Sequence, residues 1–174
     1  MLTKLVLSFL PLVVLANAEE CIDYSVHASE IQNCCPLPFG LPQEPLEDCI
    51  KPAEQQVPDK NKKSFTACAY ECYTKKLGII NGQTVQMDKI KEYMEKLEVN
   101  AGRIRIAAWD ACDQNKSKIL DALKGHTLKC HPFAFKMMTC VEYLVDRNCP
   151  AEYFNDKSEI CQKLRSGVPF CNSS

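Results

Sequence analysis

Cysteines are the residues of this sequence that could do the most chemistry, because a thiol can act as a nucleophile, a metal ligand or one half of a disulfide. The chain has twelve cysteines among 174 residues. They are Cys21, Cys34, Cys35, Cys49, Cys68, Cys72, Cys112, Cys130, Cys140, Cys149, Cys161 and Cys171. No two are separated by two residues, the spacing typical of zinc sites. In an exported chain, this even number predicts a framework of up to six disulfides.

An export signal is present at the N-terminus. An apolar stretch, residues 5–15, follows Lys4 and precedes the small residues Ala16-Asn17-Ala18. This order is typical of a secretory signal peptide and predicts cleavage after Ala18. The stretch is also shorter than the roughly 20 apolar residues that cross a bilayer. We therefore expect a signal peptide at residues 1–18 and a secreted, extracellular domain at residues 19–174.

The sequence contains none of the motifs that would indicate a catalytic site. The six glycines do not cluster into a phosphate or calcium loop, and neither G-x-S-x-G nor H-E-x-x-H is present. Cys34-Cys35 is followed by Pro36 and not by the histidine that a secreted phospholipase would need. The sequence therefore predicts no enzyme, no metal and no cofactor. His126 and His131 are instead candidates for a pH-sensitive site, because imidazole titrates near pH 6.5.

The charge balance says which partners to expect. The formal net charge is −1, with 21 basic and 22 acidic residues, whereas nucleic-acid binding would need a basic stripe. The short basic run at Lys60, Lys62 and Lys63 is interpreted as a solvated loop. Two glycosylation sequons begin at Asn115 and Asn172. We expect no nucleic-acid partner.

Helices must position the cysteines. Apolar residues recur at helical spacing after residue 64. They predict helices at 64–78, from 84 to about 97, and at 103–114, 117–124, 132–146 and 158–165. Ser64 would cap the first helix, and Gly78 would end it. The segment 132–146 is apolar on nearly all sides, which is typical of a helix in the middle of a domain.

The N-terminal part has a different composition. Six prolines between residues 36 and 58 predict that residues 19–63 are rich in loops, with short helical turns at 29–34 and 46–49. No stretch of the chain alternates like a strand. The predicted fold class is therefore all-α, a single domain of six to eight helices. Its parts would be a loop-rich N-terminal extension (19–63), a core (64–149) and a C-terminal extension (150–174).

Methionine and aromatic positions on these helices form a candidate ligand pocket. Methionine side chains adapt to apolar ligands of different shape, and dense disulfides would stabilise a hollow interior. Such stripes more often belong to an ordinary packed core, so that interpretation stands beside the pocket. The candidate residues are Met87, Ile90, Tyr93, Met94, Leu97, Ile104, Ala108, Trp109, Leu123, Phe133, Met137, Met138, Val141, Leu144 and Phe170.

The cysteine spacing resembles that of a known family. Cys68-x3-Cys72-x39-Cys112, with Cys140-x8-Cys149 later, is similar to the framework of insect odorant-binding proteins. The stretch from Cys68-Ala-Tyr-Glu-Cys72 through Lys76, Gly78 and Gly82 to Met87 resembles that family's second and third helices. The additional Cys130, the pair Cys149-Pro150 and the later Cys161 and Cys171 resemble the Plus-C subclass. The resemblance covers residues 68–171.

The resemblance implies both a structure and a function. It implies an all-helical cup around an apolar cavity, with the bridges Cys68–Cys140 and Cys112–Cys149. It also implies that Cys72 pairs with Cys49 or Cys35, of which we prefer Cys49. Members of this family bind small hydrophobic odorants or pheromones and carry them through aqueous lymph to receptors at a membrane.

Two other functions fit the same sequence. The protein could be a general secreted binder of lipids or other hydrophobic molecules outside olfaction. It could also be an interaction protein whose segments 19–63 and 150–174 dock a partner chain or exchange within a homodimer. In that case side chains of the protein, including Phe170, would fill the cavity.

Overall fold

Helices make up most of the part of the chain that the computed structural model describes, residues 21–59, 61–125 and 127–171. In chain order they are α1 (Tyr24–Ile31), α2 (Glu44–Gln56), α3 (Lys62–Lys76), α4 (Met87–Met94), α5 (Val99–Gln114), α6 (Lys116–Ala122), α7 (Phe133–Arg147) and α8 (Glu159–Ser166). A small antiparallel hairpin, β1 (Ile80–Asn81) and β2 (Thr84–Val85), joins α3 to α4. The predicted all-α class is confirmed. The predicted signal peptide, residues 1–18, lies outside the described residues.

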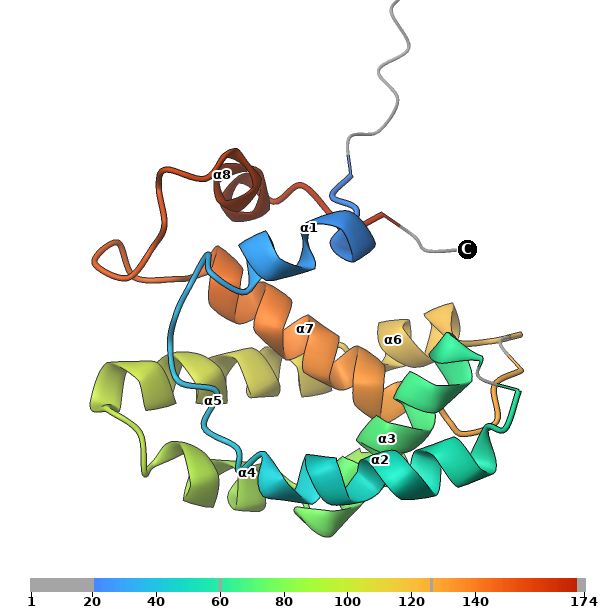
Figure 1. Cartoon of the computed structure of the whole chain (residues 1–174). Helices are drawn as coiled ribbons and strands as arrows, with labels where there is room; N and C mark the ends of the chain where they lie inside the picture. Colours follow the sequence, from blue (N-terminus) through green and yellow to red (C-terminus); the bar gives the residue numbers. More distant parts are fainter. Residues whose placement is uncertain (1–20, 60, 126, 172–174) are drawn as a thin grey trace, which may run out of the picture.

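Helix α7 crosses the middle of the fold (Figure 1). It packs against α3, α5, α6 and α8. Its buried side chains include Phe133, Met137, Val141 and Val145, which lie at successive turns of the helix. The prediction of a central helix at 132–146 is confirmed. None of the helices in the described ranges is both long and apolar enough to cross a membrane.

The N-terminal part contains more helix than its prolines suggest. A short turn at 46–49 is predicted, but α2 runs for 13 residues. Pro45 lies in the first turn, where its missing N–H is not needed. Pro52 lies inside the helix, where it removes one hydrogen bond. The disulfide from Cys49 to Cys72 and packing against α3 hold α2 in place, so tertiary contacts outweigh the local cost of Pro52.

Helix α3 begins before the predicted cap. Asn61 is the N-cap, and its side chain accepts a hydrogen bond from the N–H of Ser64 at 2.9 Å. Ser64 is buried instead, and its hydroxyl accepts from the N–H of Lys129. The prediction of a loop at the basic run is therefore partly wrong. Lys62 and Lys63 form the first turn of α3, while Lys60 lies outside the described residues.

Helix α5 also begins earlier than its apolar pattern predicts. It starts at Val99 and not near residue 103. The Glu98 carboxylate accepts hydrogen bonds from the N–H groups of Asn100 and Ala101. This glutamate takes the role that serine, threonine, asparagine and aspartate usually fill at a helix start, so the usual capping signal is missing.

All twelve cysteines form disulfides, as predicted, but two implied pairs are wrong. The six bridges are Cys21–Cys171, Cys34–Cys161, Cys35–Cys149, Cys49–Cys72, Cys68–Cys130 and Cys112–Cys140. Cys49–Cys72 agrees with the preferred pair. Cys68–Cys140 and Cys112–Cys149 do not form.

The position of Cys130 explains the error. Cys130 lies before α7 and next to α3, where its Cα is 5.0 Å from that of Cys68. Cys140 lies along α7 and faces Cys112 of α5. The implied pairing order (first with third, second with fifth, fourth with sixth) is kept when Cys130 and Cys140 serve as the fifth and sixth cysteines. Cys149 is then free to join Cys35.

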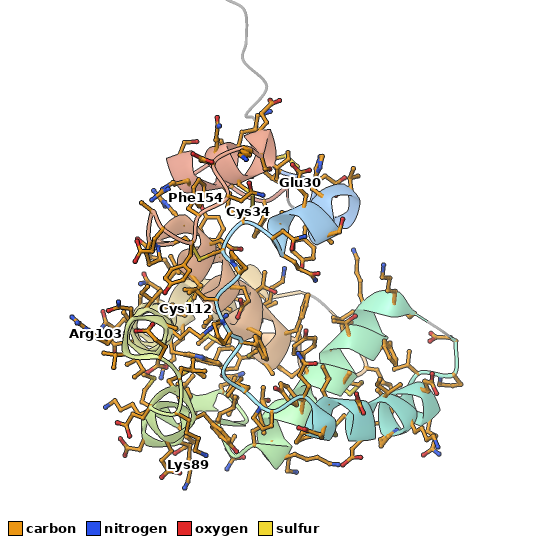
Figure 2. All side chains as sticks on the ribbon, turned by 60° about the vertical axis from the view of Figure 1, so that its left-hand side comes forward. Glu30, Cys34, Lys89, Arg103, Cys112 and Phe154 are labelled. Atoms are coloured by element: carbon orange, nitrogen blue, oxygen red, sulfur yellow. A yellow bond between two sulfur atoms is a disulfide. The ribbon has the colours of Figure 1, made fainter. Side chains whose placement is uncertain are left out.

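Parts of the two predicted extensions meet in one layer beside α7. Helices α1 and α8 pack together (Figure 1), and their buried residues form a second hydrophobic cluster. The hydroxyl of Ser158 donates to Glu30 at 2.6 Å and also caps α8. Glu30 is seen beside Cys34 at this junction in Figure 2. The Cys21–Cys171 bridge joins the two ends of the described chain. We call this unit, residues 21–34 with 155–171, the end layer.

Candidate ligand-binding site

The structure brings the candidate pocket residues together. Every one except Phe170 belongs to a single hydrophobic cluster, here called the main core, or packs against it. Those inside the cluster are Ile90, Met94, Ala108, Trp109, Leu123, Phe133, Met137, Met138 and Val141. Those packed against its edge are Met87, Tyr93, Leu97, Ile104 and Leu144. They come chiefly from α4, α5 and α7, with Leu97 after α4 and Leu123 after α6.

Phe170 lies elsewhere. Its ring packs edge-on against Tyr24 at 5.6 Å and Tyr143 at 5.3 Å between centroids. It packs against the second cluster, in the end layer. The structure therefore does not place Phe170 with the other candidate residues.

The main core is filled by its own side chains. Trp109, Phe133, Ile90, Met94 and Met137 are among its fully buried residues. Four of the five methionines of the chain follow the predicted signal peptide, and all four line or touch this core. Unbranched thioether side chains change shape more easily than branched ones. The main core thus combines rigid aromatic side chains with flexible methionine side chains.

A covering segment crosses the main core between α1 and α2. We call residues 35–41 the strap, and Figure 1 shows it descending from α1 past α5 to α2. Leu37 and Leu41 of the strap are buried in the main core, and Phe39 packs against it. The strap is fixed at its start by Cys35–Cys149 and continues into α2, which Cys49 ties to α3.

Two glycines allow the strap and α5 to approach α4 closely. Gly40 has φ of +80°, and a Cβ there would lie 2.8 Å from side-chain atoms of both Met94 and Leu97. Gly102 of α5 touches the backbone of Met94, since a Cβ would lie 2.5 Å from its carbonyl oxygen. Met94 and Leu97 are thus enclosed from two sides by positions that exclude a larger residue.

A buried arginine holds the strap down. Arg105 of α5 is 3% exposed. Its guanidinium donates hydrogen bonds to the carbonyls of Pro38 at 2.5 Å and Leu37 at 3.2 Å, and to Glu142 of α7 at 2.8 Å. It also lies over the ring of Phe39. Sequence reasoning missed Arg105, although it lies three residues before Ala108 and seven before Cys112, on the buried face of α5.

A second acid lies near this ion pair. Asp146 is one turn after Glu142 on α7 and is 7% exposed. Burial and the neighbouring Glu142 raise the pKa of Asp146 to about 7, against the opposing effect of Arg105. This carboxyl is therefore a titrating group in the neutral range, and no pattern in the sequence predicts it.

The structure describes one of the two histidines proposed as a pH-sensitive site, His131. His131 is exposed, and its Nδ1 accepts a hydrogen bond from the N–H of Phe133 at 3.2 Å. Its other ring nitrogen lies 3.3 Å from the amide of Gln83. His131 thus lies just before α7 and next to the β1–β2 turn, and it is not a residue of the main core. His126 lies outside the described residues.

Two surface grooves flank α5. One, of about 440 Å³, lies between α4 and α5 and is lined by Met87, Lys91, Arg103, Ile106, Ala107 and Asp110. The other, of about 540 Å³, is lined by Asn100, Arg103, Ile104, Ala107, Pro150 and Glu152. Only Met87 and Ile104 among the candidate pocket residues line them. Sequence reasoning missed the rest, because most of them stand on the solvent side of α5.

Comparison with known proteins bears on what such a fold binds. No protein-family model matches this chain. The chain is 28% identical over 150 residues to a protein of Anopheles gambiae named General odorant-binding protein 68. The aligned region covers 81% of this chain and 69% of that protein. The chain is therefore similar, at modest identity, to a protein named for binding odorants.

Proposed function

We propose that this protein is a secreted, non-enzymatic carrier of small hydrophobic molecules of the odorant or pheromone kind. It would take them up in the main core and carry them through aqueous lymph to membrane receptors. We also propose that it belongs to the Plus-C odorant-binding proteins. The observation that carries this proposal is the methionine-rich core, enclosed by α4, α5, α7 and the strap inside six disulfides. The similarity to the Anopheles gambiae protein supports it.

Apolar burial would supply the binding energy. Each Å² of apolar surface removed from water contributes roughly 25 cal/mol. Part of this is offset by the loss of ligand freedom and by the ordering of side chains. A ligand of odorant size would then bind at about micromolar strength, or roughly 8 kcal/mol. Such affinity suits a carrier that must release its cargo.

Uptake requires the core to rearrange, because its side chains already fill it. Met94 and Met137 are fully buried and have three flexible side-chain torsions each. Rotating them would open space between α4, α5 and α7 without moving the disulfide-linked backbone. The strap over Met94 and Leu97 lies on the path into that space.

Displacement of a neutral fluorescent probe tests the carrier function. Oxidised protein comprising residues 19–174 is titrated with N-phenyl-1-naphthylamine and then with neutral odorants of increasing size. We expect saturable binding to one site and micromolar competitors. Met137→Ala enlarges the core and should shift the competitor ranking toward larger molecules, whereas Lys118→Ala on the exposed surface should not. Absence of saturable uptake by protein with all six disulfides would overturn the proposal.

A further inference from the structure

The groove between α4 and α5 is a hollow of the size that small ligands occupy. Its volume of about 440 Å³ falls within the range of roughly 300–1,000 Å³ found for ligand pockets. It lies on the outside of the molecule, separate from the interior space proposed for neutral cargo. It shares Arg103 and Ala107 with the groove on the other side of α5.

The floor of the groove is apolar and firmly supported. Met87 and Ile106 line it, and both also pack against the main core. Ala107 also lines the groove and is exposed. The methyl group of Ala107 leaves the groove open, and a larger side chain would fill it. An alkyl chain lying here would cover three apolar side chains on a surface that does not need to rearrange.

Two positively charged side chains at the rim of the groove have few partners within the described part of the protein. Arg103 is exposed on the outer side of α5 (Figure 2), and it has no hydrogen bond or ion pair within the described residues. Lys91 makes only a long contact of 4.0 Å with Asp88. The acid in the groove, Asp110, already accepts a hydrogen bond from Gln114 at 2.7 Å. The groove therefore presents two cations and one acid whose hydrogen-bonding capacity is partly used.

An unpaired arginine beside an apolar groove matches a specific ligand chemistry. The planar guanidinium fork binds a carboxylate through two parallel hydrogen bonds. We propose that the α4–α5 groove is a second binding site, which takes amphiphiles with a carboxylate head and an alkyl tail, such as medium-chain fatty acids. The carboxylate binds Arg103, with Lys91 nearby, and the tail lies over Ala107 between Met87 and Ile106. This site does not depend on uptake of neutral molecules by the main core.

The methionines allow both sites to be observed in one sample. Only Met87, Met94, Met137 and Met138 follow the predicted signal peptide, so methyl-labelled methionine gives four NMR signals. Met87 reports on the groove and on the edge of the main core that it contacts, whereas the other three lie in the main core and do not line the groove. Titration with decanoate should move the Met87 signal in a saturable manner. Decanol, which has the same tail without the charge, should bind the groove more weakly.

Matched variants separate the contribution of the charged rim from that of the apolar floor. Arg103→Gln should weaken decanoate binding at Met87 about tenfold or more, since a charge-assisted hydrogen bond is lost. It should leave decanol binding unchanged. Ala107→Leu should weaken both ligands, and Lys118→Gln, which removes a distant surface charge, should weaken neither.

Three outcomes would overturn the groove site. They are no saturable shift of Met87 with decanoate, equal binding of decanoate to Arg103→Gln and wild type, or shifts confined to Met94, Met137 and Met138. Uptake of N-phenyl-1-naphthylamine is measured on the same variants. Loss of that uptake with an intact decanoate response would contradict the carrier proposal alone, and the reverse would contradict the groove alone.

Discussion

The guanidinium of Arg105 lies 2.8 Å from the carboxylate of Glu142, and the same buried side chain binds the carbonyls of Leu37 and Pro38. One residue therefore joins α5, α7 and the strap. Apolar packing is not directional, whereas these hydrogen bonds fix the strap at one position over the main core. The position of the strap thus depends on a polar contact inside an apolar fold.

Replacing Arg105 should destabilise the protein strongly. In Arg105→Met, two strap carbonyls and the partly exposed Glu142 lose their partner. Leaving a buried hydrogen-bonding group without a partner typically costs about 1–3 kcal/mol. Arg103→Met is the matched control, because it removes an exposed and unpaired arginine from the same helix. Its free energy of unfolding should change by about 0.5 kcal/mol or less. Guanidinium unfolding of the oxidised proteins measures both, and equal values for the two variants would refute the role of Arg105 as an anchor.

Asp146 should make stability depend on pH. Its pKa is raised from 3.8 to about 7 in the folded protein. Well below pH 3.8 the carboxyl is protonated in both states. As pH rises toward neutrality, the unfolded chain releases this proton while the folded chain keeps it, so the contribution of Asp146 to stability falls.

Asp146→Asn removes that titration. Relative to wild type, the variant should gain stability as pH rises from about 4 to about 7, by up to a few kcal/mol, and the difference should level off at higher pH. Asp156→Asn, at an exposed position, should show no such trend. Unfolding free energies measured at several pH values between about 4 and about 8 give the comparison. A constant difference between Asp146→Asn and wild type would show that Asp146 titrates normally.

The Cys21–Cys171 bridge should serve the end layer and not ligand binding. It closes the end layer, whose hydrophobic cluster is distinct from the main core. Replacing both cysteines with alanine should speed hydrogen exchange in α1 and leave uptake of the neutral probe unchanged. The comparison is the Cys68→Ala, Cys130→Ala pair, which frees α3 from the start of α7 and should reduce uptake. Loss of uptake in the Cys21, Cys171 pair would place the end layer in the binding site.

The sequence predicts some parts of this structure better than others, for physical reasons. The central helix α7 can be predicted from the sequence because its apolar residues recur on nearly every side. Helix α2 cannot be predicted in the same way, because Pro52 disfavours a helix. The disulfide from Cys49 to Cys72, which holds α2 in place, becomes known only from the structure. The pairing of Cys68 with Cys130 depends on which end of α7 meets α3. The spacing of cysteines along the chain does not contain that information.

The candidate site can also be predicted only in part. Its apolar residues follow helical periodicity, and the structure gathers them into one cluster. Arg105, Glu142 and Asp146 come from two helices, and the strap carbonyl of Pro38 is 67 residues away from Arg105 in sequence. Such contacts leave no local pattern. The grooves beside α5 cannot be predicted from the sequence either. An exposed arginine is common on a helix surface, and only its spatial neighbours mark it as part of a groove.

The most direct test of the central claim is an NMR titration of methyl-labelled methionine with N-phenyl-1-naphthylamine, which carries no charge. If the main core takes up small hydrophobic molecules, the signals of Met94, Met137 and Met138 will shift together and saturate with one dissociation constant. If these three signals stay in place at saturating probe, or if only Met87 responds, the main core is not the carrier site.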